Sequence, residues 1–388
     1  MDVKELSCQY KDDIIRWRRT IHANPEIAWH EVETSRFIAA ELDKMGIGYV
    51  FVGGGKGVLA TLEGARPGRT VALRADIDAL PLQELTDVPY KSKNNGCMHA
   101  CGHDGHAAAL LGAAKILSQL KCDIVGTVKF IFQPAEEGGF GSSKLIEEGI
   151  LDGVDGIFAL HVSPSIPTGN ISIEAGPRMA SGDKFTITVH GKTGHGALPH
   201  QGIDAILAAS AIVTNLQSIN SREVNPAEPV VITICKITGG SRWNFICNEV
   251  VMEGTTRCFN PDIRNRFEMM MGRIIECTAE SFRATAELDY EYVAPATIND
   301  RHIACIAQKA VSELYGNKVF ATVPQSMTGE DFAYMLERVP GAIALLGVGN
   351  PEKGCNHPLH DNLFNMDEDA LPIGSAMHAQ FVLDFLSD

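Results

Sequence analysis

The chain has 388 residues, 45% hydrophobic and 21% charged, which is typical of a soluble globular protein with about two domains. Its formal net charge of −15 argues against nucleic acid or an anionic membrane as a partner, because binding a phosphate backbone requires a basic surface. No signal peptide and no apolar run of roughly 20 residues is evident, so we expect no membrane span. Ten cysteines without paired spacing favour reduced thiols and a cytoplasmic location.

The first half of the chain alternates helical and strand patterns. Helical periodicity predicts helices over 12–22, 34–45 and 106–120, and apolar runs predict strands over 71–75, 127–132 and 156–161. This order indicates an α/β domain with a mainly parallel sheet. The glycine-rich run 52–57 precedes a strand pattern and not a helix, so we interpret it as a hairpin loop. Neither a G-x-S-x-G motif nor a phosphate-binding loop motif is present.

A different pattern begins near residue 181. Strands are predicted over 184–190, 229–237, 249–257 and 286–292, and helices over 203–219 and 262–283. This β-α-β-β-α-β order is typical of a ferredoxin-like α+β domain, whose edge strand could pair with a second copy. The α/β pattern then resumes, with a helix over 301–315 and a strand over 342–346. We therefore predict a domain at 181–292 inserted into a domain formed by 1–180 and 293–388.

The densest cluster of chemically reactive residues is MHACGHDGH, residues 98–106, just before a predicted helix. Cys101 would lie near the positive end of that helix, where a thiolate is stabilised, and His103 is two residues away. A structural zinc knuckle that uses Cys97 is the alternative, but the spacing is poor for one.

Three further segments offer metal ligands at predicted strand ends. Glu136 and Glu137 follow the 127–132 strand, where one carboxylate could bind metal while the other shuttles protons, although such pairs usually lie on solvated faces. His161 ends an apolar strand, a position where histidine is more often a hydrogen-bonded core residue. His360 follows the last predicted strand. Convergence of cysteine, histidine and glutamate on one sheet predicts a metal site.

Several motifs together resemble the N-acyl-amino-acid amidohydrolase family, which includes hippurate hydrolases, acetyl-diaminopimelate deacetylases and auxin-conjugate hydrolases. The resemblance covers nearly the whole chain. The matching segments are Arg18-Arg19 with His22 and Pro25-Glu26, LRADIDALP (73–81), MHACGHDGH (98–106), FQPAEEGG (132–139), LHV (160–162), GKTGHGALPH (191–200), GEDFAYMLERVPG (329–341) and HPLHD (357–361).

The resemblance implies two divalent metal ions per subunit, about 3.5–4 Å apart. Its metal ligands correspond to Cys101, His103, Glu137, His161 and His360. Cys101 would bridge the ions, with His103 and His161 completing one site and Glu137 and His360 the other. The mixed donor set accepts zinc, manganese, cobalt or nickel. Glu136 is implied as the general base.

The resemblance also implies roles for the inserted domain, which corresponds to a lid and dimerisation domain of a homodimer. His195 matches a histidine that reaches the active site of the partner subunit and stabilises the oxyanion. Asn244 corresponds to a residue near the substrate. The family's Asn-Val-Ile-Pro-Asp segment reads Asn-Phe-Ile-Cys-Asn here, which bears on substrate specificity and not on the metal ligands. Trp243 beside it could line an acyl pocket or pack within the domain.

The expected function is metal-dependent hydrolysis of the amide bond of small N-acetyl or aroyl amino acids, which releases a carboxylic acid and a free amino acid. A dipeptidase or carboxypeptidase with the same two-metal site is the alternative enzyme. A metal-binding protein without turnover is the alternative from another class, and Glu136 argues against it, since binding alone needs no second carboxylate.

Overall fold

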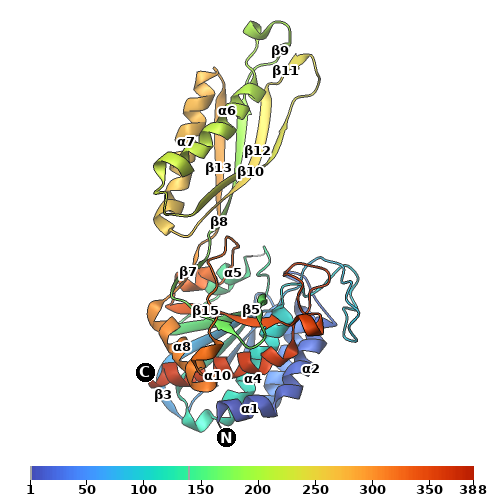
Figure 1. Ribbon diagram of the computed structural model, residues 1–388, viewed down its shortest axis with the longest axis vertical. Helices are drawn as coiled ribbons and strands as arrows, with labels where there is room; N and C mark the ends of the chain where they lie inside the picture. The colour runs from blue at the N-terminus through green and yellow to red at the C-terminus, as the bar shows by residue number, and fades with distance from the viewer. Residues whose placement is uncertain (1, 139) are drawn as a thin grey trace. The chain divides into compact units, whose positions relative to one another are not determined.

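The computed structural model describes residues 2–138 and 140–388, which form two compact units (Figure 1). Unit 1 comprises the described residues of 1–176, 298–324 and 334–388, and unit 2 comprises 177–297 and 325–333. The sequence assigned 325–333 to the larger domain. Hydrogen bonds instead tie the beginning of this segment to unit 2, since Ala180 donates its N–H to the Ser326 carbonyl at 3.0 Å and the Gln325 side chain donates to the Pro177 carbonyl.

Unit 1 is built on a seven-stranded mixed sheet. Its strands, in spatial order, are β1 (Gly48–Val52), β2 (Gly57–Glu63), β4 (Val125–Gln133), β3 (Arg66–Asp76), β5 (Gly156–Pro167), β15 (Gly341–Gly349) and β6 (Ile171–Ser172). Strands β4, β3, β5 and β15 run parallel, whereas β1, β2 and β6 are joined in antiparallel pairs. The prediction of a mainly parallel sheet is therefore right only for the centre.

The antiparallel edge begins at the predicted hairpin loop. Gly53, Gly54 and Gly55 all have positive φ, between 61° and 91°, and connect β1 to β2. Glycine adopts this left-handed conformation without steric cost, so the run can turn the chain tightly. The hairpin interpretation of 52–57 is confirmed.

Helices surround this sheet. They are α1 (Val3–Gln9), α2 (Lys11–His22), α3 (Val32–Met45), α4 (His103–Gln119), α5 (Gly141–Glu147), α8 (Arg301–Tyr315) and α10 (Leu371–Ser387). The short helix α9 (Ala333–Leu336) begins at the last residue of the segment 325–333. Helices α4 and α10 pack against the central strands β3, β4 and β5, with α1 and α2 packed on them (Figure 1). Helix α4 is buried on all sides from His103 to Ala114, as its alanine- and leucine-rich sequence allows.

Unit 2 has a four-stranded antiparallel sheet. Its spatial order is β10 (Val230–Gly239), β12 (Glu249–Cys258), β8 (Gly182–His190) and β13 (Thr285–Ala294). Helices α6 (Ala205–Ser218) and α7 (Pro261–Ser281) complete the predicted β-α-β-β-α-β order, and the core lies between them and the sheet. Burial alternates along β12 because one face of the sheet packs on the helices. Two short strands of this unit, β9 (Gly194–His195) and β11 (Phe245–Ile246), pair with each other. Another short pair, β7 (Gly176–Met179) and β14 (Thr297–Asn299), includes the residues at which the chain passes from one unit to the other.

All ten cysteines are free. Among the described residues, no helix combines the length and the apolarity that crossing a bilayer requires.

Candidate metal centre

The candidate ligands of unit 1 gather at the carboxyl ends of the central parallel strands. The end of β3 is level with the end of β4, since Asp76 pairs with Gln133. Strand β5 continues past this level to Pro167. His161 therefore lies inside a strand, whereas the sequence pattern predicts it at the end of one. This edge of an open α/β sheet is where ligands commonly bind.

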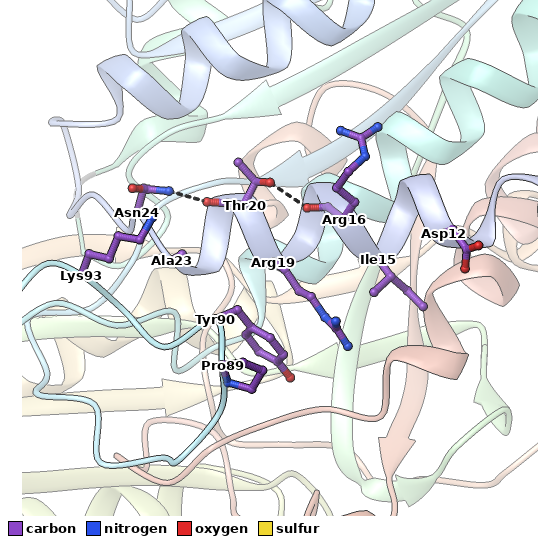
Figure 2. Close-up of a pocket in the computed structure, with 10 residues that line it drawn as sticks. All are labelled: Asp12, Ile15, Arg16, Arg19, Thr20, Ala23, Asn24, Pro89, Tyr90 and Lys93. Atoms are coloured by element: carbon purple, nitrogen blue, oxygen red, sulfur yellow. Dashed lines mark hydrogen bonds between the residues drawn. The ribbon is translucent and has the colours of Figure 1, made fainter.

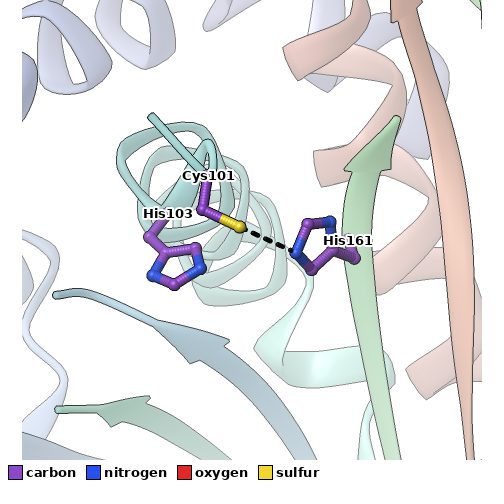
Figure 3. A group of neighbouring side chains, drawn as sticks. All are labelled: Cys101, His103 and His161. Carbon is purple, nitrogen blue, oxygen red and sulfur yellow. Dashed lines mark hydrogen bonds between the residues drawn. The ribbon is translucent and has the colours of Figure 1, made fainter. Parts of the chain in front are cut away.

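Cys101, His103 and His161 form the first ligand group, shown in Figure 3. Cys101 immediately precedes the N-terminus of α4, and its Sγ lies 3.6 Å from Nε2 of His161. Between the two ligands that flank it, Gly102 adopts a φ of 87°, and a Cβ there would come within 2.3 Å of Val162. Glycine alone fits both demands, which explains how the chain presents Cys101 and His103 together.

Cys101 also belongs to a second ligand group, with Glu137 and His360. Nε2 of His360 lies 3.0 Å from the Glu137 carboxylate, and its backbone N–H donates to the Ala100 carbonyl at 2.8 Å. The His360 side chain is half-exposed, whereas that of Glu137 is only 17% exposed. The Cys101 thiol is thus shared by two groups of three potential ligand atoms. Within each group, the three atoms lie within 4.8 Å of one another.

The tautomers of two histidines are fixed by their neighbours. Nδ1 of His103 lies 2.9 Å from the Asp78 carbonyl, and Nδ1 of His161 lies 2.8 Å from the Val162 carbonyl. A carbonyl only accepts, so each Nδ1 carries a proton, and Nε2 is the ring nitrogen that is left to bind a metal ion. In the described chain, Nε2 of His103 is buried without a hydrogen-bond partner. This arrangement matches the way proteins orient metal-binding imidazoles.

The electrostatics of the centre favour a cation. Burial raises the pKa of the Cys101 thiol above its usual range, the charge on His103 opposes the rise, and Glu137 and Glu136 add to it. A thiolate at this position therefore needs a positive charge beside it, which a metal ion supplies. The sulfur, nitrogen and oxygen donors fit the predicted divalent transition-metal ions.

Glu136 lies beside these ligands. A carboxylate oxygen of Glu136 lies within 4.8 Å of ligand atoms of His103 and Glu137. The side chain is half-buried, in a turn that follows β4. Cys97 is not part of any ligand group among the described residues, and its thiol donates to the Pro25 carbonyl at 3.4 Å, so the zinc-knuckle alternative finds no support.

Two buried aspartates that were not predicted as site residues, Asp76 and Asp78, support the candidate ligands. Asp78 approaches Nδ1 of His103 at 3.2 Å through Oδ1 and accepts the Glu137 N–H at 2.9 Å through Oδ2. Asp76 bonds Nδ1 of His106, whose Nε2 accepts the Val162 N–H at 2.8 Å. Both nitrogens of His106 are thus engaged. The LRADIDALP motif, with two aspartates after a buried strand, was the signal that could have revealed this support.

His195 and Asn244 lie in unit 2 and not among the ligand groups of unit 1. Strands β9 and β11 bring the two residues together, and the Gly196 N–H donates to the Asn244 carbonyl at 2.9 Å. The Ala197 N–H donates to Nδ1 of the exposed His195 at 3.1 Å. Neutral His195 therefore carries its proton on Nε2, which is available as a donor.

A separate hollow of about 530 Å³ lies against α2 and the segment 89–93 (Figure 2). The hollow is lined by residues that include no cysteine or histidine. They are Asp12, Ile15, Arg16, Arg19, Thr20, Ala23, Asn24, Pro89, Tyr90 and Lys93. Arg19 is paired with Glu368 and Arg16 with Asp13. This hollow is therefore not the metal centre.

The fold and the paired ligand groups define a metal-dependent amidohydrolase. Residues 72–384 match the model of peptidase family M20/M25/M40, and the chain belongs to this family.

Similar proteins include thermostable carboxypeptidase 2 of Saccharolobus solfataricus, 42% identical over 99% of this chain and 97% of that protein. The N-acetyl-L-cysteine deacetylase of Bacillus subtilis is 41% identical over 92% of this chain and 84% of its own length. A solved structure, the Bacillus subtilis YXEP protein, described as a dinuclear metal binding peptidase of the M20 family, matches with a TM-score of 0.87 at 37% identity. That match covers 98% of this chain and 99% of that one.

Proposed function

We propose that this chain hydrolyses the amide bond of N-acyl amino acids, releasing a carboxylic acid and a free amino acid. The observation that carries the proposal is the sharing of the Cys101 thiol by two ligand groups, with the Glu136 carboxylate beside them. The similarity to an N-acetyl-L-cysteine deacetylase supports an acylated amino acid as the substrate.

Five residues would hold two divalent ions, with Cys101 as the bridge. His103 and His161 would complete one site, and Glu137 and His360 the other, in line with the two ligand groups. When bound, the ions supply Lewis acidity that polarises a carbonyl and lowers the pKa of a water molecule. The donor set accepts zinc, manganese, cobalt or nickel.

Glu136 is the proposed general base. It takes a proton from the attacking water and returns it to the amide nitrogen, which leaves as an amine. Its position supports this role, because a carboxylate oxygen of Glu136 lies within 4.8 Å of ligand atoms of His103 and Glu137, where it can reach a water molecule held by the proposed ions.

Unit 2 is proposed to act as the lid and dimerisation domain of a homodimer. Strands β10 and β13 form the two edges of its sheet, and an edge strand can pair with a second copy. We assign His195 as the oxyanion donor through Nε2–H in the partner subunit's active site, and Asn244 as a substrate contact. The ten free thiols support a cytoplasmic location.

A carboxypeptidase is the second candidate, favoured by the 42% identity to thermostable carboxypeptidase 2. The two reactions have the same leaving group, an amino acid with a free carboxylate. They differ in the acyl side, which is a simple carboxylic acid in one case and an aminoacyl or peptidyl group in the other.

A substrate panel separates these candidates. Purified protein loaded with Mn²⁺ is assayed with N-acetyl-methionine, hippurate and the dipeptide Gly-Met, with a chelated sample as control. We expect a higher kcat/KM for the acylated amino acids and no turnover in chelator. A preference for the dipeptide would favour the carboxypeptidase, and metal-loaded protein inactive on all three compounds would contradict the proposal.

A further inference from the structure

The turn that carries Glu136 and Glu137 has an unusual backbone. Ala135 adopts a φ of 56°, a left-handed conformation that costs a residue with a Cβ about 1–2 kcal/mol. The turn is closed by the Gly141 N–H, which donates to the Ala135 carbonyl at 3.0 Å. Such strain persists only where surrounding contacts hold it, and it is common at active sites.

Glu31 supplies one of these contacts from far away in the sequence. Its side chain is fully buried, and Oε1 accepts the Ala135 N–H at 2.8 Å across 104 residues. Glu31 occupies the N-cap position of α3, yet its side chain makes no capping hydrogen bond to that helix. The carboxyl therefore does not cap its own helix, and besides the Ala135 N–H it is also hydrogen-bonded by the backbone of Glu31 and Trp29.

Asp78 holds the other side of Glu136. It accepts the Glu137 N–H at 2.9 Å. The N–H groups of Ala135 and Glu137, the residues on either side of Glu136, are therefore both bound by buried carboxyl groups. With its neighbours fixed at both ends, the Glu136 backbone has little freedom to rotate. A proton shuttle depends on such placement, since a misplacement of about 1 Å can cost on the order of 100-fold in rate.

We propose that Glu31 is a positioning residue for Glu136: by accepting the Ala135 N–H it fixes the left-handed turn that presents the general base. The inference rests on the proposed function of Glu136. Glu31 acts through the backbone and touches neither substrate nor metal.

Two groups of variants test this role. Glu31→Gln keeps an acceptor oxygen in a side chain of the same length but carries no charge; burial raises the pKa of Glu31 to about 7, so the native side chain is itself partly protonated near neutral pH. Glu31→Ala removes the acceptor, and Glu31→Asp withdraws it by one methylene in case the alanine variant does not fold. Glu148→Ala is the control for losing a carboxylate that accepts a distant backbone N–H, because the exposed Glu148 accepts the Gly53 N–H at 2.9 Å.

For N-acyl amino acid hydrolysis we expect Glu31→Ala to lower kcat on the order of 10- to 100-fold, with KM and metal content unchanged. Glu31→Asp should show a smaller loss, and Glu31→Gln and Glu148→Ala should stay near wild type. A purely structural role would lower metal content and activity in parallel. The proposal would be overturned by such a parallel loss, or by an unchanged kcat in Glu31→Ala and Glu31→Asp. It would also be overturned by a Glu31→Gln variant as impaired as Glu31→Ala.

Hydrogen exchange of the peptide that contains 134–138 gives a second measurement, independent of turnover. Protection should fall in Glu31→Ala and Glu31→Asp but not in Glu31→Gln or Glu148→Ala. If wild-type protein hydrolyses no amide, the proposed function fails, while the exchange data still decide whether Glu31 anchors the turn. Unchanged protection in Glu31→Ala and Glu31→Asp would refute the anchor.

Discussion

Two neighbouring carboxylates have different surroundings at the carboxyl end of β4. The Glu137 carboxylate lies 3.0 Å from Nε2 of His360 and shares a ligand group with Cys101, and its own N–H is held by Asp78. Burial opposes ionisation of Glu137, but its contacts with His360 and the charge on His103 lower its pKa below the usual value. An anionic Glu137 suits the metal binding proposed for it, and the proposed proton transfer is assigned to Glu136.

Glu136→Gln tests this division at the level of single residues. An amide cannot carry a proton, whereas Glu137 and the other proposed ligands are untouched. We expect metal content to remain at wild-type level while kcat falls by roughly 10²–10⁴-fold. Metal analysis and kinetics on the same preparation make the test, with Glu137→Gln as the comparison that should lose metal. A Glu136→Gln enzyme with near wild-type kcat would show that another group moves the proton.

The candidate ligands could be found in the sequence because their residue types are distinctive and they stand in short recognisable motifs such as MHACGHDGH and HPLHD. The residues that orient them could not. Asp78 acts through an accepted N–H and a neighbouring imidazole, and Glu31 through an amide 104 residues away. These contacts depend on how the loops lie in three dimensions, and no periodicity or spacing in the sequence encodes them.

Among the helices and strands, the type of most could be predicted from sequence patterns, but some predicted ends near the site are wrong. Helix α4 begins at His103 and not at 106, because Gly102 precedes it in a left-handed conformation without a side-chain cap. Strand β5 continues six residues beyond the predicted end at His161, reaching Pro167. Helix α10 was missed since it is apolar on nearly all sides and shows no amphipathic period.

Asp183 connects three elements of unit 2, namely β8, α7 and β13. It is buried at the start of β8 and accepts hydrogen bonds from Arg264 on α7 at 2.7 and 2.9 Å. It also accepts bonds from Tyr290 and the Val293 N–H on β13. Removing one partner of a buried ion pair leaves an uncompensated charge, so Asp183→Ala should destabilise unit 2 by about 3–5 kcal/mol.

Hydrogen exchange of β8, α7 and β13 measures that loss. Asp289→Ala, at an exposed position of β13, is the control and should change stability by less than about 0.5 kcal/mol. Equal effects of the two variants would mean that Asp183 does not hold the three elements together.

For the whole molecule, the β-α-β-β-α-β order of unit 2 could be predicted from the strand and helix patterns of the sequence. No pattern in the sequence indicates that residues 325–333 belong to unit 2. That segment joins unit 2 through backbone bonds such as Ala180 to Ser326, which any sequence can make. Dimerisation and the position of His195 in a partner's active site remain predictions of the proposed function.

Mixed dimers test the position of His195. His195→Ala should lower kcat by about 10²–10³-fold with metal content intact, the usual loss for one oxyanion donor. If the donor acts in the partner's site, a dimer of His195→Ala and Glu136→Gln subunits holds one doubly defective site and one intact site. Activity should then return on mixing. Verified mixed dimers without recovery would place His195 in its own subunit's site or outside catalysis.

The central claim is that this chain hydrolyses amides through a pair of metal ions held around Cys101. Stepwise addition of Mn²⁺ to chelated protein, with hippurate hydrolysis followed at each step, tests it most directly. The account predicts no activity without metal and a rise that reaches its plateau at two ions per chain. Full activity in the chelated protein, or a plateau at one ion per chain, would contradict it.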